Sequence, residues 1–275
     1  MVKLRLDSIS SAGTNRHVSG SYVDNHLQHQ VWLLTLRGAL HLVSTPESFR
    51  SVLDVGCGTG VWALAIASMH TNVQVTATDL TPPTSIVPPA NVKFIKADAD
   101  TEWALGKFDF IHGRMITSGI HDWQVFLSRC WEHLEFGGVL ELLDICHPFG
   151  SDDPSSELAS AVIRFGHAAE KCWGKKGLDY RASMKHVDRL TKLGFENITE
   201  TELKWPLGEW ASTDREKKMG KLTLSNFRTF LEMAGVKILT SDSEMSPQTA
   251  QVLVDEALKE LSAGDSGSKK LYLSM

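Results

Sequence analysis

The chain has 275 residues, enough for one large α/β domain with additional elements and too many for a small scaffold held together by disulfides. Apolar residues make up 42% of it and charged residues 22%, which is typical of a folded globular protein and excludes a disordered or fibrous one. With 28 Lys and Arg against 33 Asp and Glu, the net charge of −5 gives no overall field that attracts nucleic acid, so we expect no nucleic-acid partner.

The four cysteines stand apart in the sequence, without a C-x-x-C pair. This spacing favours free thiols over a zinc site or a disulfide framework, and we expect no metal. No stretch approaches the roughly 18 consecutive apolar residues of a membrane-spanning helix, and the first 16 residues lack the apolar core of a signal peptide. We therefore expect no membrane partner and a cytoplasmic location, with the nucleus as the alternative.

The N-terminal region divides into two parts. Residues 1–20 are rich in small polar types without apolar periodicity, which predicts a loose arm. Residues 21–45 are interpreted as a helical extension, because apolar residues recur near helical spacing there, with Gly38 as an interruption. The remaining residues, 46–275, are assigned to one domain.

Between residues 51 and 145, short apolar segments alternate with helical stretches, the pattern of a parallel sheet wound with helices. We predict, in chain order, strand 51–55, helix 61–69, strand 73–78, strand 92–95, strand 108–112, helix 122–134 and strand 139–143. Four prolines between residues 82 and 89 exclude a helix between the second and third strands, so an extended loop is expected there.

Beyond Pro148 the pattern becomes mainly helical. We predict helices over 155–171, 182–193 and 247–261, a mainly helical segment over 205–245, and strands over 195–203 and 270–273. Gly194 suits a helix C-cap. Insertions around 150–182 and 205–262 are expected to form a helical cap over the domain.

The most distinctive motif is the glycine-rich turn Gly56-Cys57-Gly58-Thr59-Gly60, placed where the first strand ends and the first helix begins. Glycines there let the backbone approach a ligand closely, and the helix N-terminus supplies free amides. Its spacing differs from the G-x-G-x-x-G of dinucleotide-binding proteins, because Val61 occupies the place of the third glycine. Asp54, just before the turn, would repel a pyrophosphate but suits the ammonium group of an amino acid.

Two later carboxylates complete an ordered series. Asp79 ends the second strand, where it can accept hydrogen bonds from both hydroxyls of a ribose. Asp98 follows the third strand and can accept from an adenine amino group, while Ala99 offers a backbone amide. An amino acid, a ribose and an adenine together describe S-adenosylmethionine, although a tight turn or a helix cap would explain each signal taken alone.

These motifs resemble those of the class I S-adenosylmethionine-dependent methyltransferases, and more narrowly those of the fungal LaeA-like and secondary-metabolism branch. The resemblance covers roughly residues 22–261, with matching segments at 27–36, 52–60, 88–92, 108–114, 134–138 and 205–208. It implies an α/β, Rossmann-like fold of seven mostly parallel strands, the last one antiparallel, with helices on both faces. It also implies S-adenosylmethionine as cofactor and S-adenosylhomocysteine as product.

The expected cofactor site gathers residues from the turn, the strand ends and the N-terminal extension. Its members are Tyr22, Asp54, Gly56, Cys57, Gly58, Gly60, Asp79, Leu80, Asp98, Ala99, His112 and Gly113. The resemblance implies that His112 and Gly113, at the end of the fourth strand, lie near the methionine part of the cofactor.

Methyl transfer is an in-line displacement that needs an aligned nucleophile and, for a hydroxyl acceptor, one base. His112 and His147 are the predicted catalytic residues, because both lie near strand ends that open toward the same crevice; a structural role is the alternative for His112. His121, Trp123 and Trp173 are the predicted substrate-binding residues, since aromatic side chains in a cap can stack on a flat acceptor. Core packing is the alternative for each tryptophan.

We therefore expect a methyltransferase acting on a small molecule, a fungal secondary metabolite, with oxygen preferred over nitrogen or carbon as the acceptor atom. Two alternatives stay open. One is a LaeA-like regulatory protein that works in a complex with a protein partner. The other is an enzyme of the same fold that uses the cofactor's sulfonium as an electrostatic element in a cyclisation.

Overall fold

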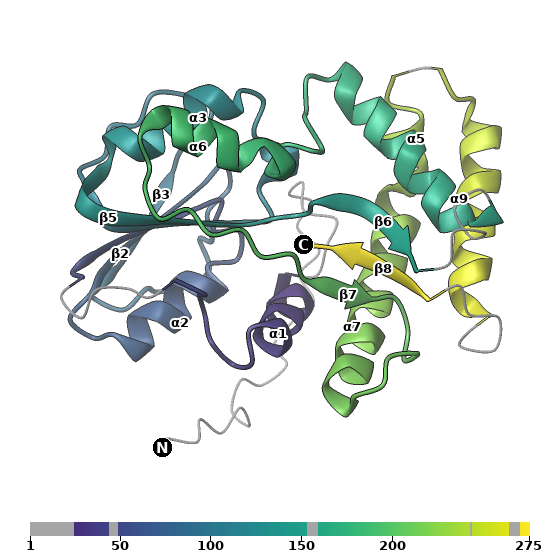
Figure 1. Cartoon of the computed structure of the whole chain (residues 1–275), viewed down its shortest axis with the longest axis horizontal. Helices are drawn as coiled ribbons and strands as arrows, with labels where there is room; N and C mark the ends of the chain where they lie inside the picture. The colour runs from purple at the N-terminus through teal and green to yellow at the C-terminus, as the bar shows by residue number, and fades with distance from the viewer. Residues whose placement is uncertain (1–24, 44–48, 153–158, 243, 264–269) are drawn as a thin grey trace.

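A computed structural model describes residues 25–43, 49–152, 159–242, 244–263 and 270–275. The predicted arm over residues 1–20 and the predicted cofactor residue Tyr22 lie outside this part of the chain. The described elements form two lobes, a sheet lobe with helices on both faces and a mainly helical lobe beside it (Figure 1).

The sheet lobe is built on five parallel strands in the order β3-β2-β1-β4-β5. Their bounds are Ser51–Val55 for β1, Gln74–Asp79 for β2, Val92–Lys96 for β3, Phe108–Arg114 for β4 and Leu134–Leu143 for β5. The five predicted strands are confirmed, but β5 begins five residues earlier than predicted. The register between β4 and β5 shifts between the pairs Phe108–Leu134 and Phe110–Val139, and Gly137, with φ of 77°, lies within that irregularity.

Helices cover both faces of this sheet (Figure 1). The helix α2 (Val61–Met69) lies on one face, and α3 (Trp123–Glu132) and α6 (His186–Leu193) lie on the other. Alternation along β1 explains this arrangement, because Val52 packs in the cluster of α2 and Leu53 in that of α3. A parallel sheet buried on both faces reads as an almost continuous apolar run, as this strand does.

Two further predictions about local structure are confirmed, those for the proline-rich loop and for Gly194. Residues 80–91 between β2 and β3 contain no helix, as their prolines predicted. The helical extension predicted over 21–45 is found only in part, because the helix α1 (Asn25–Thr35) ends before Gly38, whose φ is 90°, and residues 36–43 contain no helix. Gly194 caps α6 in the left-handed conformation, and a 3₁₀ turn (Ser183–Lys185) precedes that helix. A second 3₁₀ turn, Thr117–Gly119, follows β4.

The helical lobe has its own core. It contains α5 (Ala161–Lys175), α7 (Asp214–Phe230), a π-helical segment η3 (Leu231–Gly235), α8 (Val236–Leu239) and α9 (Pro247–Ser262). Buried apolar side chains from these helices form one cluster. The helix α1 packs against α7, with Trp32 and Met219 in a shared cluster, so the N-terminal helix joins the two lobes.

The seven-stranded sheet implied by the resemblance is wrong for the described residues. The strands β6 (His147–Ser151), β7 (Lys204–Pro206) and β8 (Leu271–Ser274) instead form a separate antiparallel sheet in the order β6-β8-β7. Because β8 is paired on both sides, it has no free edge with which to extend the five-stranded sheet. The predicted strand over 195–203 is also wrong, since pairing begins only at its end, where Leu203 and Met275 exchange backbone hydrogen bonds of 2.9 and 2.8 Å.

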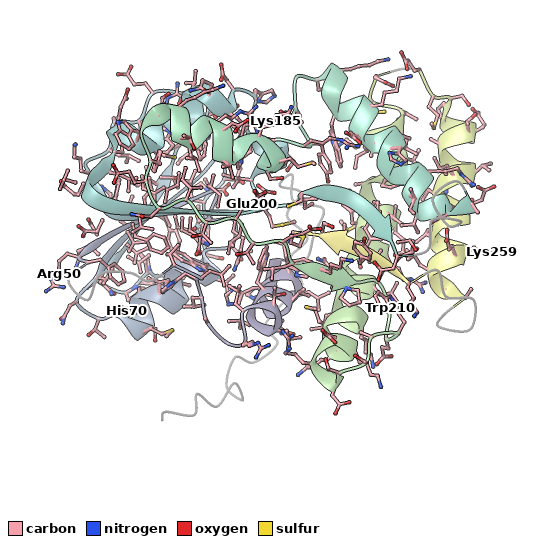
Figure 2. All side chains as sticks on the ribbon, in the orientation of Figure 1. Arg50, His70, Lys185, Glu200, Trp210 and Lys259 are labelled. Carbon is pink, nitrogen blue, oxygen red and sulfur yellow. The ribbon has the colours of Figure 1, made fainter. Side chains whose placement is uncertain are left out.

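The carboxyl ends of the five strands face the helical lobe. Arg50, which precedes β1, lies at one end of the molecule, and Trp210 and Lys259 lie at the other end, in the helical lobe (Figure 2). The chain segments predicted as cap insertions contain α5 and α7 to α9, but their separation from the domain over 46–275 stays a prediction.

Candidate functional site

A cavity of about 3360 Å³ lies between the strand ends and the helical lobe. It is lined by the glycine-rich turn, by the ends of β1, β2 and β4, and by residues of α1, α5 and α7. Small-molecule sites occupy about 300–1,000 Å³, so this cavity has room for two molecules. In open α/β sheets, ligands bind outside the carboxyl ends of the strands, which is the position of this cavity.

The glycine-rich turn is fixed to the end of β2. The backbone N–H of Cys57 donates to the carbonyl of Thr78 at 2.9 Å, and that of Gly58 donates to Asp79 Oδ2 at 2.8 Å. Gly60 has φ of 76°, and a Cβ atom there would lie 2.5 Å from Phe94 Cζ. The turn therefore requires glycine for both its backbone angle and its close packing.

Asp54 and His112 form a buried pair at the base of the turn. Asp54 is only 3% exposed, and its Oδ1 lies 2.9 Å from Nδ1 of His112. The other carboxylate oxygen, Oδ2, is buried without a hydrogen-bond partner in the described part of the chain. The His112 ring stacks on Trp62, whose indole N–H donates to the carbonyl of Leu40 at 2.7 Å.

Asp79 and Asp98 keep free acceptor capacity at the rim of the cavity. Asp79 accepts one backbone N–H on each oxygen, from Gly58 on Oδ2 and from Thr81 on Oδ1 at 2.9 Å. Asp98 Oδ1 accepts the N–H of Asp100 at 2.9 Å. Since a carboxylate has about four acceptor positions, each side chain can accept further hydrogen bonds from a ligand.

Most of the predicted cofactor residues are brought together here. Those that line the cavity are Asp54, Gly56, Cys57, Gly58, Asp79, Leu80, Asp98, Ala99 and His112. Gly60 and Gly113 do not line it but allow close packing behind it, because a Cβ at Gly113 would lie 2.9 Å from Ile116 Cδ1. Their contacts with a cofactor stay predictions.

The thiol of Cys57 is unsuited to act as a nucleophile. Burial raises its pKa, and the negative charges of Asp54 and Asp79 raise it further. A thiol in such surroundings stays protonated at neutral pH. Cys57 therefore contributes backbone and shape to the turn.

The three predicted substrate-binding residues separate in the structure. Trp173 lines the cavity and stacks on Tyr180, with ring centroids 4.2 Å apart. Trp123 is only 2% exposed, packs in the core of the sheet lobe against Phe126, and is not a lining residue. His121 also lies outside the lining, with a side chain 60% exposed and paired with Asp100 at 2.7 Å. Trp123 and His121 thus lie apart from the cavity, and their roles as substrate contacts stay predictions.

His147, the second predicted catalytic residue, can be placed by its backbone alone. It is the first residue of β6 and pairs with Ser274 of β8. The structure does not describe its side chain, so its catalytic role stays a prediction.

Sequence reasoning missed a partly buried pair, Arg114 and His29. The guanidinium Nη2 of Arg114 donates to Nδ1 of His29 at 3.2 Å, and both residues line the cavity. Burial lowers the pKa of Arg114 to about 10 and that of His29 to about 4, so at neutral pH the arginine is charged and the histidine is neutral. Because arginine only donates, Nδ1 accepts and the proton of the neutral ring is on Nε2.

Both residues lie in segments that carry the family resemblance, 27–36 and 108–114, but only Arg114 has a position that indicates a site. Arg114 ends β4, two residues after His112, so its strand-end position could have marked it. His29 comes from α1, whose placement beside the strand ends depends on packing against α7. No spacing within the sequence reveals that packing.

The described residues contain neither a metal-binding cluster nor a membrane-spanning helix. No group of three or more His, Cys, Asp or Glu side chains in this part of the chain could hold a metal ion. No helix in the described ranges is both long enough and apolar enough to cross a membrane.

A family model, curated relatives and solved structures are similar to this chain. A family model described as a methyltransferase domain matches residues 26–200. Methyltransferase pytC of Aspergillus terreus is 30% identical over 227 residues, which is 82% of this chain and 70% of that protein. Secondary metabolism regulator LAE1 of Cochliobolus heterostrophus is 29% identical over 209 residues, 71% of this chain and 66% of that protein. Among solved structures, phosphoethanolamine N-methyltransferase 2 of Haemonchus contortus with S-adenosyl-L-methionine has a TM-score of 0.46 at 16% identity, covering 90% of this chain and 50% of that one.

Proposed function

The chain belongs to the methyltransferase-domain family, in its LaeA-like branch, and on that premise we propose that it methylates an oxygen of a small secondary metabolite. Its cofactor is S-adenosylmethionine, which supplies a methyl group on a positively charged sulfur and leaves as S-adenosylhomocysteine. The observation that carries the proposal is the unpartnered Oδ2 of Asp54, buried beside a glycine-rich turn at the edge of a cavity large enough for two molecules.

The carboxylates at the strand ends suit the separate parts of this cofactor. Asp54 Oδ2 would accept from the ammonium group, which removes the cost of a buried acceptor without a donor. Asp79 would accept from the ribose hydroxyls, and Asp98 from the adenine amino group. The nucleoside would lie against the glycine-rich turn, where Gly56 and Gly58 line the cavity.

Arg114 would hold the carboxylate of the methionine part. Its side chain is partly buried, it lines the cavity, and its Nη2 donates to the neutral ring of His29. A buried cation gains most from an anionic ligand that accepts two parallel hydrogen bonds. Asp54 and Arg114 would thus bind the two opposite charges of one amino acid.

The remaining task of the chain is to align the acceptor hydroxyl and to take its proton. In this proposal His112 takes the proton at Nε2, which has no hydrogen-bond partner among the described residues. The Asp54 carboxylate accepts from Nδ1 and so fixes the orientation of the ring, as in other Asp–His pairs. Trp173 and Tyr180 lie on the other wall of the cavity, where they would contact the acceptor.

Calorimetric titration of S-adenosylhomocysteine, followed by incubation with methyl-labelled cofactor and a panel of phenols, carboxylic acids and amines, tests the proposal. We expect binding by the folded protein and label in a phenol. Absence of binding by folded protein would overturn the assignment of this cavity. Label confined to amines would overturn the preference for oxygen, whereas label confined to carboxylic acids would keep oxygen as the acceptor atom but replace the hydroxyl by a carboxylate. Turnover of a metabolite extract without label would point to the cyclisation alternative.

A second function is favoured by the similarity to a secondary metabolism regulator. In that case the chain would act within a complex with a protein partner. Purification from a native extract distinguishes the two functions, because a stable partner in fixed stoichiometry would support regulation. Recovery of the chain alone, with labelled product in the assay above, would support the enzyme.

A further inference from the structure

The part of the cavity that faces the helical lobe is lined by aromatic rings. These rings, here called the aromatic wall, belong to Phe149, Phe165, Trp173, Tyr180, Phe227 and Phe230. Phe227 lies at the centre of one group, with its ring centroid 4.7 Å from that of Phe149 and 5.9 Å from that of Phe230. The stacked pair of Trp173 and Tyr180 forms a second group. Rings arranged in this way offer flat apolar surface to a ligand.

The aromatic wall carries no charge. The lining residues contributed by α5 and by the second half of α7 include no acidic or basic side chain. Burial raises the pKa of Tyr180, as do the negative charges of Asp144 and Glu170, so its phenol is neutral across the physiological range. An ionised ligand would lose its hydration here without gaining an opposite charge.

One polar side chain interrupts the wall. Asn226 is 8% exposed, lines the cavity, and has an Oδ1 with no hydrogen-bond partner among the described residues. Thr223, one turn earlier on α7, also lines the cavity, but its hydroxyl donates to the carbonyl of Met219 at 2.9 Å. Asn226 therefore has an unpaired acceptor, whereas the Thr223 hydroxyl is already bonded. A buried acceptor without a donor lowers stability, and native structures rarely keep one unless a ligand or water donates to it.

We propose that the aromatic wall and Asn226 form the acceptor subsite, and that this subsite binds a neutral, planar aromatic molecule in which a hydroxyl other than the one that is methylated donates to Asn226 Oδ1. The inference rests on the proposed function, since the cofactor edge and the aromatic wall line one cavity. It goes beyond that function by specifying the charge, the shape and one hydrogen bond of the acceptor. It also assigns Asn226 as a residue that determines specificity.

Three small probes separate these features in the wild-type protein saturated with S-adenosylhomocysteine. 2-Naphthol has the flat ring and the donor, naphthalene lacks the donor, and 2-naphthoate replaces it with a negative charge. Ligand-observed NMR should give 2-naphthol an affinity about fivefold or more above that of naphthalene, the ratio expected for one hydrogen bond. It should give 2-naphthoate the weakest binding. Equal affinities for 2-naphthol and 2-naphthoate would overturn the proposal.

Substitutions on α7 locate the hydrogen bond. Asn226→Leu should remove the preference for 2-naphthol over naphthalene while naphthalene binding is retained. The matched control is Thr223→Val, one turn away in the same lining, which should keep the preference because its hydroxyl is already bonded within the helix. If Asn226→Leu does not fold, Asn226→Ala makes the same test. Retention of the preference in either folded Asn226 variant would refute the role of Asn226.

The cofactor titration keeps this test separate from that of the proposed function. Loss of S-adenosylhomocysteine binding with the 2-naphthol preference intact would count against the cofactor assignment alone. Normal S-adenosylhomocysteine binding without any preference for 2-naphthol would count against the subsite alone. Phe230→Leu should weaken binding of both naphthalene and 2-naphthol, because it removes a ring of the wall.

Discussion

The rings of His112 and Trp62 are stacked, with centroids 3.6 Å apart and planes within 2° of parallel. The two residues come from β4 and from α2, the helix that begins directly after the glycine-rich turn. Because Nδ1 of the same imidazole also bonds Asp54, the ring is held both by its face and by its edge. His112 therefore fixes which oxygen of Asp54 is left for a ligand.

The first prediction concerns the coupling between His112 and Asp54. His112→Phe keeps a flat ring against Trp62 but leaves Asp54 Oδ1 without its donor, so the free energy of unfolding should fall by about 1–3 kcal/mol. When Asp54 is already replaced by Asn, His112→Phe should lower the free energy of unfolding by clearly less. A double-mutant cycle by chemical denaturation measures this difference. Additive effects of the two substitutions would contradict a direct interaction.

The second prediction concerns the ribose site. Asp79→Asn replaces one of two accepting oxygens by a donor, so either Gly58 or Thr81 loses its acceptor, and a ribose hydroxyl loses one as well. We expect S-adenosylhomocysteine affinity to fall about tenfold or more in a calorimetric titration. Asp109→Asn is the matched control, because Asp109 accepts from Arg50 and Ser51 near the opposite ends of the strands. That control should lose stability and keep its cofactor affinity.

The third prediction compares two glycines with positive φ. Gly60→Ala would bring a Cβ within 2.5 Å of Phe94 Cζ, whereas nothing lies within 4 Å of a Cβ at Gly38. Each alanine should lower the stability of the protein by about 1 kcal/mol, because its backbone must adopt a left-handed conformation. Only Gly60→Ala should also displace the turn and weaken cofactor binding, as measured by calorimetry. Equal loss of binding in both variants would show that the turn does not form the site.

The fourth prediction concerns pH and His186. Burial lowers the pKa of this histidine to about 4, and neither ring nitrogen has a hydrogen-bond partner among the described residues. The unfolded chain, with a histidine pKa near 6.5, takes up a proton first as the pH falls, so the folded state loses stability between about pH 6.5 and 4. His186→Phe keeps an aromatic contact with Trp123 and should flatten this part of the stability curve.

Chemical denaturation at pH 7 and pH 5 provides the measurement for His186. The wild type should lose more of its unfolding free energy than the variant between these two values. At pH 7 the variant should be at least as stable as the wild type, because it removes two buried nitrogens without partners. Parallel losses in the two proteins would show that other groups dominate the acid response.

Local pattern was sufficient for the first half of the fold and for the cofactor edge of the site. The strands from β1 to β4, the helix α2 and the helix-free proline loop follow from apolar periodicity and from the missing N–H of proline. The position of β8 could not be predicted, because a four-residue strand fits either sheet and its two partners come from distant parts of the chain.

The acceptor side of the site depended on tertiary packing. Trp123 and Trp173 both lie in helical segments, and sequence alone gives no reason for the first to enter a core and the second to line a cavity. Asn226 carries no motif at all. Its significance comes from an oxygen that the fold leaves without a partner, which is visible only when every neighbour is in place.

The central place of β8 in the small sheet also bears on how the chain folds. The strand β6 pairs only with β8 in the described structure, and all the helices of the helical lobe come between them in sequence. While the chain is being synthesised, the five parallel strands can assemble from neighbouring segments, but β6 keeps an open edge until β8 emerges. Contacts of such long sequence separation form slowly. The small sheet is therefore the step at which a nascent chain would be most exposed to aggregation.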